Sequence, residues 1–164
     1  ERIESKPDGL KESEEEFVEK LRAYCVAEAD SALAGKAVFL LRNLTRGKGV
    51  GFFENEGFFP DFILWVKEGG HQRIVFVEPH GMRHEKAYWS SDKLKLHERL
   101  QEFSEKLHER GQLEDVELDS YIISATRYDD LRSFYGEEEW SREDFSDKHI
   151  LLAEDEYVGD LFAA

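Results

Sequence analysis

Two short motifs with carboxylates stand at the ends of neighbouring apolar segments. Phe59-Pro60-Asp61 opens one segment, and Glu78-Pro79-His80 closes the next. If the two segments are antiparallel strands, the start of one lies opposite the end of the other, so Asp61 and Glu78 become neighbours. Side chains two residues apart in a strand share a face, which places His80 beside Glu78. The pattern predicts two carboxylates and an imidazole in one place.

Such a group of side chains is suited to metal-dependent hydrolysis. Two carboxylates that lie close together repel one another, so a cation between them stabilises their ionised form. Oxygen ligands suit Mg²⁺ or Mn²⁺. An imidazole has an ordinary pKa of about 6.5, so His80 can accept a proton from water near neutral pH.

A hairpin is the element that must position these side chains. Residues 58–66 are apolar on both alternations, which predicts a central strand covered on both faces. Glu68-Gly69-Gly70 predicts a turn, and the apolar run within 73–78 predicts the returning strand.

The other elements follow from apolar spacing and capping signals. Ser13 and Glu16 form a capping box, which predicts a helix that starts at Ser13 and ends before Gly35. The order of helix, three strands, helix and strand predicts an α/β fold with a mixed sheet flanked by helices. The remaining predicted elements are a strand at 37–41, a loop or hairpin at 42–51, a helix within 91–110 closed by Gly111, a strand at 121–123, a helix from Thr126 or Asp129 through Tyr135, a short strand near Ile150 and a closing helix.

Length and composition predict one soluble domain. The 164 residues are 40% hydrophobic, so we expect a flexible leader at 1–12 and a single domain at 13–164. One cysteine and the lack of a long apolar run predict a reducing compartment, cytoplasmic and without a membrane contact. Because the sequence starts at Glu1 without a signal-type stretch, we expect a piece cut from a longer protein.

The motif residues resemble a known family. Pro60-Asp61 followed by Glu78-x-His80 resembles the PD-(D/E)xK motif of restriction-endonuclease-like nucleases, and the predicted element order matches the core of that fold. The resemblance covers about residues 13 to 160, and the chain is similar to the nuclease-like domain found near the C-terminus of DEAD/DEAH-type helicases related to Type III restriction subunits. The segments that carry it are 39–44 (FLLRNL), 46–53 (RGKGVGFF), 59–65 (FPDFILW) and 75–79 (VFVEP).

The resemblance implies a metal-dependent DNA endonuclease with a helicase/ATPase domain in the parent protein. Asp61 and Glu78 would be ligands of Mg²⁺ or Mn²⁺, and the carbonyl of Pro79 would be a third. The family has a lysine where this chain has His80, and Lys93 or Lys95 are candidates to replace it. Helix one of the family often adds an acid, for which Glu16 or Glu19 are candidates.

The net charge of the chain affects how it could bind the expected DNA partner. The net charge of −15 weighs against a freestanding DNA binder, because such a surface repels a polyanion. Arg42, Arg46 and Lys48 lie in a glycine-rich segment that is either a DNA-backbone contact or a flexible hairpin. The segment lacks the G-x-x-x-x-G-K-[ST] pattern, so we expect no ATPase within this chain.

Two functions remain open from the sequence. Asp61 and Glu78 favour an active endonuclease. His80 and the net charge favour a catalytically decayed module of the same fold that docks DNA or the helicase body.

Overall fold

The computed structural model describes residues 9–43, 60–82, 94–111, 114–135 and 140–163. The helices and strands are α1 (Glu12–Ala27), β1 (Lys36–Arg42), β2 (Phe62–Glu68), β3 (His71–His80), α2 (Leu96–His108), β4 (Val116–Ser124), α3 (Tyr128–Tyr135), α4 (Arg142–Ser146), β5 (Ile150–Leu152) and the 3₁₀ helix η2 (Val158–Phe162). The predicted order of helix, three strands, helix and strand is therefore present.

The strands form one mixed sheet in the order β1-β2-β3-β4-β5. β1, β2 and β3 are antiparallel neighbours, whereas β4 and β5 run parallel to β3. The predicted α/β class with a mixed sheet flanked by helices is confirmed. The central strand is β3 rather than β2, because β4 adds on its far side through the α2 crossover.

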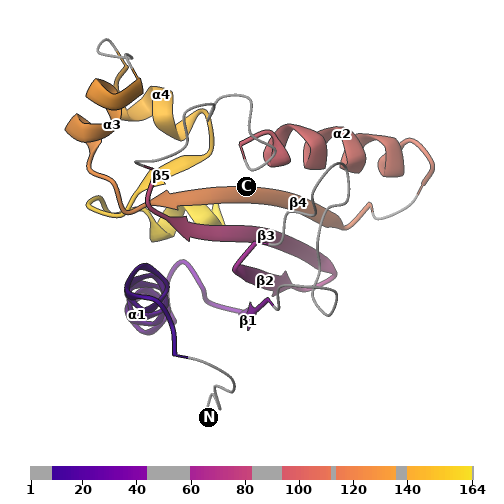
Figure 1. Cartoon of the computed structure of the whole chain (residues 1–164). Coiled ribbons are helices and arrows are strands. Elements are labelled where there is room, and N and C mark those ends of the chain that lie inside the picture. Colours follow the sequence, from indigo (N-terminus) through magenta and orange to yellow (C-terminus); the bar gives the residue numbers. More distant parts are fainter. Residues whose placement is uncertain (1–8, 44–59, 83–93, 112–113, 136–139, 164) are drawn as a thin grey trace.

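Helices cover both faces of the sheet (Figure 1). On one face, α1 packs Phe17 and Leu21 against Phe62 and Val75, and η2 closes this core with Leu161. On the other face, α2 contributes Leu96 and Leu100, which pack against Ile63 and Phe76. α1 and α2 therefore lie on opposite sides of β3.

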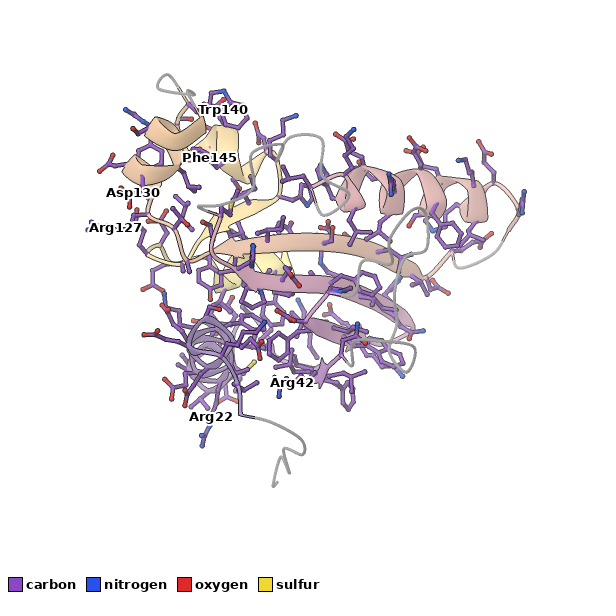
Figure 2. The ribbon with its side chains drawn as sticks, viewed as in Figure 1. Arg22, Arg42, Arg127, Asp130, Trp140 and Phe145 are labelled. Atoms are coloured by element: carbon purple, nitrogen blue, oxygen red, sulfur yellow. The ribbon has the colours of Figure 1, made fainter. Side chains whose placement is uncertain are left out.

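A third apolar cluster surrounds β5. Ile150 and Leu152 pack with Leu131 of α3 and Phe145 of α4. Trp140 and Phe145 meet edge to face with ring centroids 5.2 Å apart. Both residues are labelled at the upper left of Figure 2. This cluster anchors the C-terminal helices to the parallel edge of the sheet.

The predicted hairpin is confirmed, with Gly69 at a positive φ of 58° in its turn. The register pairs Phe62 with Val77 and Glu68 with His71. The prediction that both faces of this strand are covered is wrong, because Trp65 remains 40% exposed. Residues 58 and 59 of the predicted strand lie outside the described residues.

The predicted capping box of α1 is wrong. The helix begins one residue earlier, at Glu12, and its N-cap is Lys11 without a side-chain hydrogen bond. Ser13 instead donates its hydroxyl hydrogen to the carbonyl of Pro79 at 3.3 Å, and Glu16 pairs with Lys20. Because its hydroxyl bonds to the sheet, Ser13 does not cap its own helix.

The C-terminal third holds one helix that the apolar pattern did not predict. α4 begins with a capping box in which the Ser141 hydroxyl accepts from the Asp144 backbone and the Asp144 carboxylate accepts from the Ser141 backbone. The predicted closing helix is the short 3₁₀ helix η2. None of the helices in the described residues is long and apolar enough to cross a membrane.

Candidate active site

Asp61 and Glu78 are neighbours at the end of the β2–β3 hairpin. The backbone N–H of Asp61 donates to Oε2 of Glu78 at 3.0 Å. The register explains this contact, because Phe62 pairs with Val77 and the next pair outward is Asp61 with Glu78. Glu78 is only 8% exposed, so its carboxylate is held in place by its surroundings rather than free in solvent.

Asn43 fixes the chain that leads into Asp61. Its backbone N–H donates to the carbonyl of Asp61 at 2.8 Å, and its Nδ2 donates to the carbonyl of Pro60 at 2.9 Å. Asn43 is buried, so these bonds form in a region of reduced dielectric where they restrain the backbone well. The end of β1 thus restrains the backbone of Pro60 and Asp61 directly before β2.

Pro79 and His80 complete the end of β3. The Pro79 carbonyl accepts a hydrogen bond from Ser13, and the His80 carbonyl accepts one from the backbone of Ala125 at 3.1 Å. His80 is partly buried, and alternation along β3 places it on the face of Glu78. Pro79 and His80 therefore stand at the same strand end as Glu78. In the part of the chain that the structure describes, Asp61, Glu78 and His80 do not form a group of three side chains that could hold a metal ion.

The buried acid of α1 is neither of the two acids expected from the resemblance. Glu16 and Glu19 are exposed on α1, whereas Glu14 is 1% exposed. Its carboxylate accepts from Nη2 of Arg42 at 2.9 Å and lies 3.4 Å from Nζ of Lys11. The sequence held a signal for this placement, since Glu14 precedes Phe17 by three residues and Leu21 by seven.

The basic candidates are placed only in part. Lys95 is exposed directly before α2, and Lys93, Arg46 and Lys48 lie outside the described residues. Arg42 ends β1 and pairs with Glu14, so its guanidinium serves the packing of α1 onto the sheet. This contact argues against Arg42 as a residue of a DNA-binding loop.

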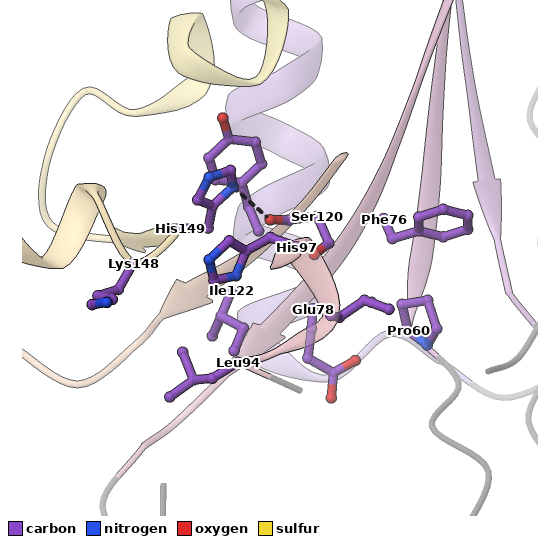
Figure 3. Close-up of a pocket in the computed structure, with 11 residues that line it drawn as sticks. Pro60, Phe76, Glu78, Leu94, His97, Ser120, Ile122, Lys148 and His149 are labelled. Atoms are coloured by element: carbon purple, nitrogen blue, oxygen red, sulfur yellow. Dashed lines mark hydrogen bonds between the residues drawn. The ribbon is translucent and has the colours of Figure 1, made fainter. Parts of the chain in front are cut away.

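A small cavity lies beside Glu78 on the α2 side of the sheet (Figure 3). Its volume is about 10 Å³, which is room for about one water molecule. Strands, the start of α2 and the segment before β5 all contribute to its wall. The lining residues are Pro60, Phe76, Glu78, Leu94, Leu96, His97, Ser120, Tyr121, Ile122, Lys148 and His149.

Two stacked imidazoles form the far side of this cavity. The rings of His97 and His149 lie 4.2 Å apart between centroids with an angle of 13°, and Tyr121 stacks on the other face of His149 at 4.7 Å. His149 Nδ1 lies 2.9 Å from Oδ1 of Asp119 and 3.1 Å from the carbonyl of Ser120. Both partners accept hydrogen bonds, so Nδ1 carries the proton.

The electrostatics of this cluster follow from burial and from these partners. Burial, together with the nearby charge of His149, lowers the pKa of His97 below its ordinary value. Burial alone would raise the pKa of Asp119, but the hydrogen bond and charge of His149 and the charge of Arg73 hold that pKa below its ordinary value. Burial, and then the charge of Asp119, raises the pKa of Tyr121 to about 12.

Sequence reasoning missed this cluster. His97 lies on α2 and is half-buried against the ring of His149. His149 occupies a left-handed backbone conformation with φ of 55°, which no side-chain pattern signals. The contact joins α2 to the segment before β5, two elements far apart in sequence.

The oxygen atoms near the hairpin end suit a hard divalent cation. Asp61 directly precedes β2 and its backbone N–H reaches the Glu78 carboxylate, and Mg²⁺ is commonly held through one or two carboxylates while it keeps several waters. Within the described residues no group of three or more His, Cys, Asp and Glu side chains could hold a metal ion. An ion held there by Asp61 and Glu78 alone would need its other ligands from water, a carbonyl or a substrate phosphate.

Comparisons with protein-family models, curated proteins and solved structures find no match to this chain.

Proposed function

We propose that this domain is a metal-dependent endonuclease of the restriction-endonuclease-like fold, which hydrolyses phosphodiester bonds in DNA. The observation that carries the proposal is the hydrogen bond from the Asp61 backbone N–H to the buried carboxylate of Glu78 at the end of the hairpin. Order of the elements and the mixed sheet support the fold assignment. We further propose that the domain acts beside the helicase/ATPase domain of a parent protein.

Asp61 and Glu78 hold the ion in this proposal, and the Pro79 carbonyl is the third candidate ligand. A bound Mg²⁺ or Mn²⁺ would offset the charge of the phosphate and lower the pKa of a coordinated water. The neutral imidazole of His80 orients the attacking water and accepts its proton. The water oxygen forms the new bond to phosphorus, the ester P–O bond breaks, and the leaving oxygen takes up a proton to become a hydroxyl.

The buried position of Glu78 helps this chemistry. A carboxylate that already accepts the Asp61 N–H has lost much of its side-chain freedom, so less entropy is lost when it binds an ion. Asn43 similarly restrains the backbone of Asp61. Asn43 therefore acts on the site only by positioning the backbone that leads into Asp61.

Cleavage of a labelled DNA oligonucleotide tests the proposal. We expect cleavage with Mn²⁺ and none with EDTA, and we expect Asp61→Asn to lose at least about a hundredfold of the rate, since the ion loses an anionic ligand. Glu102→Gln is the matched control, because Glu102 is an exposed acid on α2 whose carboxylate lies 3.7 Å from Nζ of Lys106 at the surface. Equal rates for wild type and Asp61→Asn would contradict the proposal.

A decayed module is the second candidate. It is favoured by the imidazole that stands where the resemblance implies a lysine, and by the exposed position of Lys95. This candidate expects no cleavage above the Asp61→Asn control with any divalent ion. It would leave docking to DNA or to the helicase body as the function.

A further inference from the structure

Three large apolar side chains are exposed on one face of the sheet. Phe39 is 55% exposed, Leu41 58% and Trp65 40%. Phe39 of β1 pairs with Trp65 of β2 in the register, and their ring centroids lie 6.3 Å apart at an angle of 57°. Exposed aromatic side chains that gather in this way commonly mark a binding surface.

This face is the one that carries the candidate active site. Trp65 alternates in phase with Ile63, which packs against Phe76 and α2, and Glu78 is two residues beyond Phe76 on β3. Asp61 directly precedes β2, four residues before Trp65, which corresponds to about 13 Å along a strand. The aromatic pair therefore lies on the same face of the sheet as the two carboxylates, and Trp65 is about 13 Å along the strand from Asp61.

The ammonium group of Lys67 lies beside the aromatic pair. Nζ of Lys67 is 5.9 Å from the centroid of the Trp65 ring. An aromatic ring next to an ammonium group suits a nucleotide, because the ring stacks on the base while the ammonium attracts the phosphate. Bases inside a duplex already stack on one another, so this arrangement favours unpaired bases.

The size of the patch argues against a second copy of this chain as the occupant. A stable protein interface buries about 800 Å² on each partner. Three half-exposed side chains offer on the order of 300 Å², which is ample for one or two bases but small for a dimer. The net charge of −15 would also make two copies repel.

We propose that Phe39 and Trp65 form a stacking platform for unpaired bases of a single-stranded nucleic acid, with Lys67 near its backbone. The platform would guide the strand toward Asp61 and Glu78, so its role in cleavage rests on the proposed function. Binding itself does not, because stacking requires neither an ion nor an intact carboxylate pair. Affinity from stacking depends less on salt than affinity from phosphate contacts, which suits an acidic protein.

Binding without divalent ions separates the two proposals. Fluorescence anisotropy in EDTA would follow a labelled single strand of about 10 nucleotides, and an abasic strand of the same length and charge would be the ligand control. We expect the abasic strand and Trp65→Ala each to weaken binding about tenfold, and Phe39→Ala to weaken it several-fold. Trp65→Phe should keep most of the affinity, since it retains a ring for stacking.

Phe103→Ala is the matched protein control, because Phe103 is 52% exposed on α2 and is not part of the platform. It should bind within about twofold of wild type. The proposal is overturned if wild type does not bind the single strand, if the abasic strand binds equally well, or if Trp65→Ala and Phe39→Ala bind like wild type. A concentration-dependent dimer that Trp65→Ala abolishes would also overturn it and assign the face to a second copy. A strand bound but never cleaved would leave the platform standing and remove the endonuclease.

Discussion

Glu78 shows at the residue scale how a strand end can hold a functional side chain. It is buried on the α2 side of the sheet, it accepts the Asp61 N–H, and it lines the small cavity that His97 and His149 close. His80 stands two residues further along β3. The chemical question at this scale is whether the imidazole replaces the lysine that the resemblance implies.

Cleavage should depend on pH if His80 is the general base. We expect the rate with Mn²⁺ to fall as pH drops through about 7 to 6, because a protonated imidazole cannot accept a proton. His80→Lys should raise the rate or flatten the profile, since a fixed positive charge then lies near the phosphate. The measurement is a single-turnover rate across this pH range.

His80→Ala is the informative second variant. A wild-type rate and pH profile in His80→Ala would exclude His80 from the mechanism. The general base would then have to come from another residue, and Lys93 and Lys95 would be the next candidates to replace.

At the scale of elements, α1 is attached to the sheet by polar contacts as well as by its apolar stripe. Glu14 is a buried residue of α1 and its carboxylate pairs with Arg42. The Ser13 hydroxyl donates to the carbonyl of Pro79. These contacts join the start of α1 to the ends of β1 and β3. The helix therefore braces the strand ends that carry the candidate site.

Loss of the Glu14 carboxylate should destabilise the fold. Removing one partner of a buried ion pair costs about 3 to 5 kcal/mol, and we expect about 3 kcal/mol or less for Glu14→Ala because Arg42 is one-third exposed. Glu15→Ala is the matched control, an exposed neighbour that should change the free energy of unfolding by less than about 0.5 kcal/mol. Urea unfolding measures both, and equal stability of the two variants would contradict this role for Glu14.

α2 meets the sheet edge through a titratable contact. Burial and then the charge of His149 lower the pKa of His97 below its ordinary 6.5, while a hydrogen bond to the Leu94 backbone and the charges of Glu98 and Asp119 act in the other direction. The unfolded chain then binds a proton more readily than the folded chain, so the free energy of unfolding should fall as pH drops below about 6.5. His97→Gln should reduce this dependence.

Chemical unfolding at several pH values measures the effect. A His97→Gln variant with the same pH slope as wild type would show that another group causes the decline.

The elements that the sequence predicted are those whose signal is local. Turn residues and apolar runs predicted the β2–β3 hairpin and, through it, the meeting of Asp61 with Glu78. Ser13 was misread because its hydroxyl bonds to Pro79, sixty-six residues away, instead of to its own helix. The His97–His149 stack likewise depends on the fold of distant segments, so spacing along the chain does not reveal it.

At the scale of the whole molecule, the negative net charge lowers the affinity for any nucleic acid. A net charge of −15 opposes the approach of a duplex, and Arg42 is taken up by Glu14. Attraction must come from a local patch, for which Arg46 and Lys48 are the remaining candidates of the glycine-rich segment.

Duplex DNA should therefore bind weakly at physiological salt, and its affinity should fall steeply as salt is raised. The double variant Arg46→Ala with Lys48→Ala should lower the slope of log affinity against log salt by up to about 2, one for each lost phosphate contact. Salt titrations of anisotropy measure this slope. Tight duplex binding by the double variant would contradict the assignment of these residues.

The central claim is that Asp61 and Glu78 together hold a divalent ion. The most direct measurement is anomalous scattering from a crystal grown or soaked with Mn²⁺, with an Asp61→Ala crystal as the control. The account predicts a manganese peak within about 2.3 Å of a carboxylate oxygen of each residue, and no peak there in Asp61→Ala. A wild-type crystal with Mn²⁺ bound elsewhere, or with no ion at the end of the hairpin at saturating Mn²⁺, would contradict it.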